Sequence, residues 1–99
     1  MMKYARNVRF QIKNGKEVEF KTLFENQILP LLKKQNGFRD EVTLTGSDHR
    51  VAISLWDDRA SAEKYASAVY PQVIETLKPV LDGTPTVSLY EIGATTLSA

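Results

Sequence analysis

The sequence predicts an α+β fold in which a four-stranded antiparallel sheet carries two helices on one face, in the order β-α-β-β-α-β. The length of 99 residues suits one domain. Four segments alternate between apolar and polar residues as strands do, and two longer segments repeat their apolar residues with a helical period. Two β-α-β units with right-handed crossovers, joined by a hairpin, give the ferredoxin-like sandwich. We therefore expect a single domain over residues 1–99, with a loosely held tail at 93–99.

The first half of the chain changes from a strand to a helix. Residues 4–13 alternate and end in a turn at Asn14-Gly15. One side of this strand carries Val8, Phe10 and Ile12, and the other carries Asn7, Arg9 and Gln11. The helical stripe that follows comprises Phe20, Leu23, Phe24, Ile28, Leu31 and Leu32. Pro30 lacks a backbone donor, so we expect the helix to kink or restart there and to close at Asn36-Gly37.

The second half begins with a predicted hairpin. Residues 38–45 and 49–56 are expected to form its two strands around a tight turn. Asp57 or Asp58 then caps the second helix. Its apolar stripe comprises Ala62, Tyr65, Ala66, Val69, Val73, Leu77 and Val80. Pro71 interrupts this stripe and is expected to open a second helical piece.

The third and fourth predicted strands, 49–56 and 86–92, are apolar on both faces. One face of the third carries Val51, Ile53 and Leu55, and the other carries Ala52, Ser54 and Trp56. Two helices cover only one face of a sheet, and a sheet with a solvated face alternates more cleanly than this. A second copy of the chain across a two-fold axis is the simplest cover, so we expect a homodimer. The alternative is a surface patch of scattered apolar residues.

Composition excludes several classes of partner. The net charge is +1, with 13 basic and 12 acidic residues, which gives no field for nucleic acid. No segment approaches the roughly 20 apolar residues of a membrane span, so no membrane is expected. The absence of cysteine removes disulfides, zinc-thiolate sites and thiol nucleophiles, and fits a reducing compartment. No signal peptide follows the first residues, so we expect a cytoplasmic protein.

Three segments and the element order resemble a known group of proteins. The segments are ILPLLKKQNGF at 28–38, WDDRAS at 56–61 and VSLYE at 87–91. In these features the chain resembles the antibiotic biosynthesis monooxygenase superfamily over roughly residues 4–92. The resemblance implies a dimeric α+β barrel. The superfamily includes cofactor-free oxygenases of aromatic polyketides and quinols, haem-degrading enzymes and members with no assigned activity.

The resemblance to the haem-degrading branch is incomplete. That branch uses an Asn on the first strand, a Trp at the end of the third strand and a His on the second helix that ligates iron. Asn7 and Trp56 match the first two positions, but the helix after Trp56 contains no His. His49 follows a turn and is expected at a solvated hairpin tip. One His and scattered carboxylates give no preferred metal site, so we expect neither a metal nor another cofactor.

An aromatic and polar pocket is the remaining candidate site. If Ala52 and Ser54 face the helices beside Trp56, two small residues leave room beneath the helices. The candidate substrate-binding residues are Trp56, Asn7, Arg9, Phe24 and Tyr65, and the catalytic residues are unknown. Such a pocket suits cofactor-independent oxygenation of an aromatic or quinol-like molecule. The alternatives are that these aromatic residues form the core, and that the chain is a non-catalytic dimer that binds a small ligand or only assembles.

Overall fold

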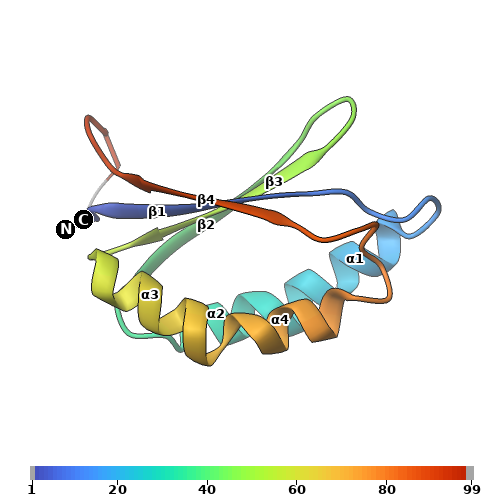
Figure 1. The fold of residues 1–99 in the computed structure, drawn as a ribbon, viewed down its shortest axis with the longest axis horizontal. Helices are drawn as coiled ribbons and strands as arrows, with labels where there is room; N and C mark the ends of the chain where they lie inside the picture. The colour runs from blue at the N-terminus through green and yellow to red at the C-terminus, as the bar shows by residue number, and fades with distance from the viewer. Residues whose placement is uncertain (1, 98–99) are drawn as a thin grey trace.

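The computed structural model describes residues 2–97 and contains one antiparallel sheet with strand order β2-β3-β1-β4. All helices lie on one face of this sheet (Figure 1). The elements are β1 (Tyr4–Phe10), α1 (Glu17–Leu23), the π-helical turn η1 (Phe24–Ile28), α2 (Leu29–Lys33), β2 (Phe38–Thr45), β3 (Arg50–Trp56), α3 (Arg59–Ala68), α4 (Tyr70–Leu77) and β4 (Thr86–Glu91). The predicted ferredoxin-like architecture is confirmed.

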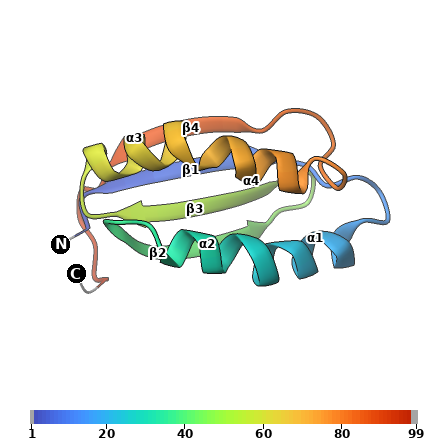
Figure 2. The same ribbon diagram turned by 90° about the horizontal axis from the view of Figure 1, so that it is seen from below.

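The helices form two rods that run side by side beneath the sheet. Seen from the helical side, α1 and α2 lie near β2, whereas α3 and α4 lie near β1 and β4 (Figure 2). Buried residues of both helical rods and of the inner sheet face make one hydrophobic core. The core comprises Tyr4, Phe10, Phe20, Phe24, Ile28, Leu32, Trp56, Ala62, Tyr65, Val73, Leu77, Val80 and Leu81.

Proline interrupts both rods, as predicted. Pro30 is within the first two residues of α2, and the helix widens to a π turn immediately before it. Pro71 occupies the same position in α4, after a break at Val69. Proline offers no N–H to the carbonyl four residues earlier, so the regular helical bond is lost at each site. Asp58 caps α3 by accepting a hydrogen bond from the Ser61 amide at 2.8 Å.

Gly37 connects the first rod to β2 in a conformation that requires glycine. Its φ is +80°, in the left-handed region that residues with a Cβ atom avoid. A Cβ atom at this position would also overlap the side chain of Ser61. The Gly37 carbonyl accepts a hydrogen bond from the Asp57 amide at 2.8 Å. The start of β2 and the start of α3 therefore meet at this residue.

The strand register decides which side chains face the helices. On β1 the helix-facing residues are Tyr4, Arg6, Val8 and Phe10, which pair with Trp56, Ser54, Ala52 and Arg50 of β3. The intervening residues, Ala5, Asn7 and Arg9, pair with Leu55, Ile53 and Val51 on the outer face. The predicted faces of β1 and β3 are thus observed, with Ala52, Ser54 and Trp56 toward the helices.

A β-bulge at the start of β2 changes which of its residues face inward. Phe38 pairs with Trp56, but Asp40 pairs with Leu55 and Glu41 with Ser54, so Arg39 is the extra residue. Glu41 therefore faces the helices, and Val42 faces outward. Arg39 forms an ion pair with Asp57, with Nη2 donating to Oδ2 at 3.1 Å.

No element within residues 2–97 covers the outer face of the sheet. Figure 1 shows this face bare, opposite the helices. Val42, Leu44 and Tyr90 lie on it with 45%, 51% and 56% of their surface exposed.

No helix among residues 2–97 is long and apolar enough to cross a membrane. Residues 93–97 of the predicted tail form neither helix nor strand, and its last two residues lie outside the described part of the chain.

Candidate functional site

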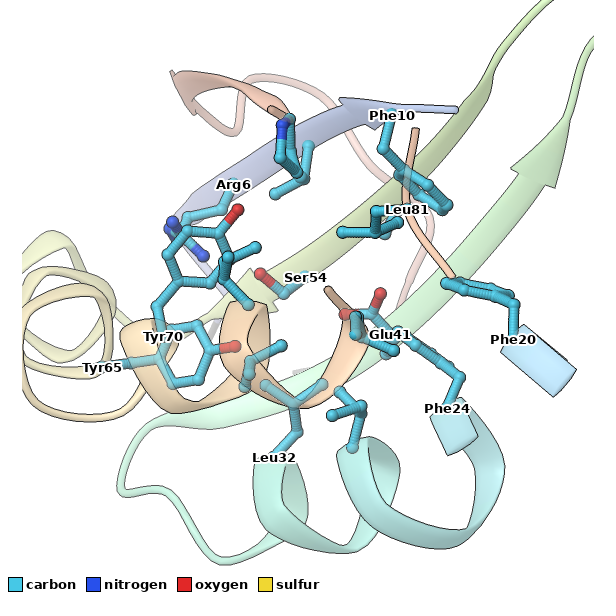
Figure 3. A pocket seen from close by; sticks show the side chains of 17 residues that line it. Arg6, Phe10, Phe20, Phe24, Leu32, Glu41, Ser54, Tyr65, Tyr70 and Leu81 are labelled. Carbon is cyan, nitrogen blue, oxygen red and sulfur yellow. The ribbon is translucent and has the colours of Figure 1, made fainter. Parts of the chain in front are cut away.

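A small cavity lies between the sheet and the two helical rods. Its volume is about 50 Å³, and its wall is mostly apolar, with contributions from β1, β2, β3 and every helical segment. Figure 3 shows Phe10, Phe20, Phe24, Leu32 and Leu81 around it, together with five residues that carry polar groups. Those five are Arg6, Glu41, Ser54, Tyr65 and Tyr70. An apolar cavity with a few convergent polar groups is the usual form of a small-molecule site.

Arg6 brings a positive charge to the wall of this cavity. It is 3% exposed because strand alternation places it on the same face as Tyr4 and Val8. Its guanidinium carbon lies 4.4 Å from the centre of the Tyr70 ring and 5.2 Å from that of Tyr65. Both rings thus stabilise the cation through their faces. Arg6 Nε has no hydrogen-bond partner among the described residues, which is costly for a buried charged group.

Glu41 places a carboxyl group in the same cavity from the opposite side. In Figure 3 its carboxyl oxygens point toward the interior, with Ser54 between Glu41 and Arg6. Burial raises the pKa of Glu41 from 4.5 to about 8, although the positive charge of Arg6 acts in the opposite direction. Glu41 is therefore mainly protonated at neutral pH, and it is a hydrogen-bond donor in that state.

Tyr65 and Tyr70 also present neutral hydroxyl groups. Burial raises the pKa of both phenols above 10, and the charge of Arg6 opposes this rise. Both side chains stay protonated across the neutral range. The two residues come from α3 and α4, on either side of the break that precedes Pro71.

Trp56 is in the core behind Ser54 and does not line the cavity. Its side chain is fully buried, and its ring centre lies 5.0 Å from that of Tyr65 and 5.5 Å from that of Phe38. The indole N–H donates a hydrogen bond of 2.8 Å to Ser54 Oγ. Because this bond uses the oxygen as acceptor, the Ser54 proton is available to another acceptor. Trp56 thus shapes the site through Ser54.

The five candidate residues predicted from the sequence lie in three different places in the structure. Phe24 and Tyr65 line the cavity. Trp56 lies behind it, in the core. Asn7 and Arg9 lie on the outer face of the sheet, where they do not reach the cavity of their own chain. A role for any of the five in substrate binding remains a prediction.

Arg6, Glu41 and Tyr70 are cavity residues with polar groups that the sequence-based candidate list does not contain. Arg6 was detectable, because it is two residues before Val8 and four before Phe10, on the face assigned to the core. Glu41 was not, since regular alternation would have placed it outside and Val42 inside. Only the bulge at Arg39 reverses that assignment.

Metal coordination has little support in the described region. Residues 2–97 contain no group of three or more His, Cys, Asp or Glu side chains placed to hold a metal ion. His49 Nδ1 lies 2.6 Å from the carboxylate of its neighbour Asp48, at the exposed hairpin between β2 and β3. That carboxylate has a lowered pKa because of the hydrogen bond from His49.

Comparison with solved structures gives close matches of fold at low sequence identity. No protein-family model and no curated protein matches the chain. NE2512, a protein of unknown function from Nitrosomonas europaea, has a TM-score of 0.81 and 22% identity over 100% of this chain and 97% of its own. SnoaB, a cofactor-independent oxygenase from Streptomyces nogalater, has a TM-score of 0.78 and 17% identity over 99% and 100%.

A third structure contains a ligand. The ActVA-Orf6 monooxygenase of Streptomyces coelicolor, in complex with Nanaomycin D, has a TM-score of 0.78 and 15% identity over 99% of this chain and 94% of its own. Identities this low show a shared fold. The chain thus shares its fold with these oxygenases and with proteins described as putative antibiotic biosynthesis monooxygenases, which is the fold that the resemblance in its sequence implies.

Proposed function

We propose that this chain is a single-domain, cofactor-independent monooxygenase that acts on an aromatic or quinol-like molecule. The observation that carries the proposal is the buried Arg6 guanidinium in an aromatic-lined cavity. Two proteins of the same fold support it, one described as a cofactor-independent oxygenase and one as a monooxygenase with bound Nanaomycin D. A cytoplasmic location belongs to this proposal.

The chemistry needs little from the protein beyond a suitable environment. The substrate supplies two electrons and two hydrogens, one oxygen atom of O2 enters the substrate, and the other leaves as water. A positive charge fixed in an apolar cavity stabilises the anion that forms when the substrate loses a proton. Arg6 provides that charge, and the surrounding aromatic rings exclude water.

Access requires aromatic side chains to move. A volume of about 50 Å³ is smaller than the roughly 150 Å³ of an apolar cavity that admits benzene. A second, open hollow of about 420 Å³ lies between the first helical rod and β2. Phe20, Phe24 and Glu41 line both spaces, so they separate the hollow from the cavity. Phe24 begins the π turn, and π turns are frequent at functional sites.

We also propose that the chain forms a homodimer through the outer face of the sheet. Val42, Leu44 and Tyr90 are exposed there beside Val51, Ile53 and Leu55. A face of this kind, packed against its two-fold copy, is expected to bury about 2,000 Å² or more in total. This interface would also cover Asn7, which lies on the same outer face. Asn7 could then contact a ligand only at a site within the dimer interface.

A non-catalytic dimer that binds a small ligand is the second candidate. The observation that favours it is the cavity volume of about 50 Å³, which leaves no space for a ring in this conformation. The fold alone does not distinguish the two candidates, since one structure that shares it has unknown function.

Oxygen uptake separates these candidates. The purified protein, treated with EDTA and free of added flavin or haem, is mixed with a panel of naphthols and hydroquinones on an oxygen electrode. We expect uptake faster than the spontaneous oxidation of at least one compound. Arg6→Met should abolish the increase, and Arg59→Met should not, because Arg59 is an exposed residue paired with Glu63. Ligand binding without oxygen uptake would reject the oxygenase and leave the binding protein. The absence of both uptake and binding would reject both candidates.

A further inference from the structure

We propose that Glu41 is the general acid of the monooxygenation, and that its carboxyl donates the proton with which the second oxygen atom of O2 leaves as water. This inference rests on the proposed function and deepens it by assigning a catalytic residue. It is carried by the place of Glu41 between two spaces, by the lack of a partner for its carboxyl, and by its surroundings.

Glu41 borders both spaces that are open to a substrate. It lines the cavity and also the adjoining hollow of about 420 Å³, together with Phe20 and Phe24. Of these three side chains, Glu41 alone has a proton to donate. Its carboxyl oxygens point toward the cavity interior (Figure 3). A ring in the hollow and a ring in the opened cavity therefore both present an edge to this carboxyl.

The Glu41 carboxyl is not engaged by the protein. No hydrogen bond or ion pair joins it to another side chain among residues 2–97. Arg6 pairs with Ser54 and Ser54 with Glu41, so the backbones of Arg6 and Glu41 lie two strand spacings, about 10 Å, apart. Arg6 thus acts on Glu41 through space without binding it. The proton of Glu41 is left for a ligand.

The acidity of Glu41 suits proton donation near neutral pH. Burial raises its pKa to about 8, so it holds a proton at pH 7 and still releases it readily. Tyr65 on α3 and Tyr70 on α4 are weaker donors, because burial raises the pKa of both phenols above 10. The Ser54 hydroxyl is a weaker acid than a carboxyl group. Glu41 is thus the strongest neutral acid in the cavity wall.

The charged groups around Glu41 come from several elements. Arg6 of β1 is the charge on the cavity side. The hollow side has two acidic and two basic residues, which are Glu17 and Lys21 of α1, Glu25 of η1 and Arg50 of β3. The residues that α2 adds to the two spaces, Leu29 and Leu32, are uncharged. Within residues 2–97, Glu41 is the one carboxyl that lines the cavity.

The reaction balances with Glu41 as the acid. The electron pair that the substrate gains on losing a proton forms a C–O bond to O2, and a proton from water completes a hydroperoxide. The O–O bond then breaks while the electron pair of the neighbouring C–H bond forms C=O and its proton passes to water. Glu41 protonates the departing oxygen, which leaves as water, and the carboxylate regains a proton from solvent through the hollow.

The fate of the second oxygen atom tests this role. A compound that the wild-type protein oxidises is followed at pH 7 on an oxygen electrode, and spontaneous oxidation is subtracted. Added catalase measures the hydrogen peroxide formed, and mass spectrometry measures the organic hydroperoxide. Loss of a general acid slows its step by about 10²–10⁴-fold. We therefore expect little peroxide from the wild type and almost one peroxide per O2 consumed from Glu41→Gln.

Two further variants and the pH profile distinguish catalysis from a structural role. Glu41→Asp keeps a carboxyl and should give an intermediate peroxide yield, whereas Glu63→Gln, at an exposed residue on α3, should match the wild type. The peroxide yield of the wild type should rise as the pH passes about 8, because Glu41 ionises. The yield of Glu41→Gln should be high at every pH. A structural role would change total uptake without changing this partition.

The outcomes separate this inference from the oxygenase itself. Oxygen uptake with an equally low peroxide yield in wild type and Glu41→Gln would overturn the role of Glu41 alone. One peroxide per O2 from the wild type at pH 7 would reject both, because no oxygen atom would then leave as water. The absence of uptake with every compound would also reject both.

Discussion

Glu41→Gln is expected to stabilise the ligand-free protein at neutral and alkaline pH. The pKa of Glu41 is raised on folding, so the folded state holds a proton that the unfolded state releases. The contribution of Glu41 to the free energy of unfolding is therefore fully present below about pH 4.5, and it is lost as the pH rises to about 8. Glutamine has a similar shape and no charge to release, so the variant should lack this loss.

The magnitude follows from the size of the shift. A rise from 4.5 to about 8, at about 1.4 kcal/mol for each pKa unit, gives an upper limit of about 5 kcal/mol. The Glu41 side chain is only partly buried, so water screens some of this cost, and we expect about 2–4 kcal/mol. Such a loss is a large fraction of the roughly 5–15 kcal/mol that stabilises a domain.

Urea denaturation at pH 5, 6, 7, 8 and 9 measures the effect. The free energy of unfolding of the wild-type protein should fall through this range relative to that of Glu41→Gln, and the difference should reach a plateau above pH 8. Glu63→Gln is the matched control, because Glu63 is an exposed residue on α3. Equal pH dependence in wild type and Glu41→Gln would show that the Glu41 carboxyl is solvated, and would remove the basis for its role in the cavity.

Three other substitutions test the fold and the assembly. Leu55→Asp places a charge on the outer sheet face, so light scattering should give a monomer mass for the variant and a dimer mass for the wild type; a wild-type monomer at micromolar concentration would refute the interface. Trp56→Phe removes a buried ring and the bond to Ser54, and should lower thermal stability by about 1–3 kcal/mol; an unchanged melting temperature would contradict the core position. Gly37→Ala should cost more than Gly83→Ala, because both glycines have positive φ but only Gly37 is crowded by Ser61; equal unfolding free energies in the two variants would show that Ser61 moves aside.

The architecture could be predicted from the sequence because strands and helices leave a periodic pattern of apolar residues. The alternation of β1 and β3, the helical stripes and the two proline breaks can each be recognised within one continuous segment of sequence, and each is observed. The capping role of Asp58 and the positive φ of Gly37 are also local properties. These features were predictable because the chain decides them over a single turn or strand.

The site was harder to predict because it depends on pairing between segments. Trp56 suggested a pocket wall, but the small neighbour Ser54 bonds to its indole and lies between it and the cavity. Asn7 and Arg9 were proposed as polar partners although their alternation with Val8 places them outside, whereas Arg6 was overlooked as a buried cation. The inward position of Glu41 follows from the register between β2 and β3, which no local pattern reveals.

The extra residue Arg39 can be lost without exchanging the two faces of β2. Deleting it would let Asp40 follow Phe38 directly opposite Leu55, so that regular alternation would still place Glu41 opposite Ser54 and Val42 opposite Ile53. The deletion would remove the bulge and the ion pair between Arg39 and Asp57. The carboxyl group in the cavity and the apolar residues on the outer face would therefore both survive the loss of this one codon.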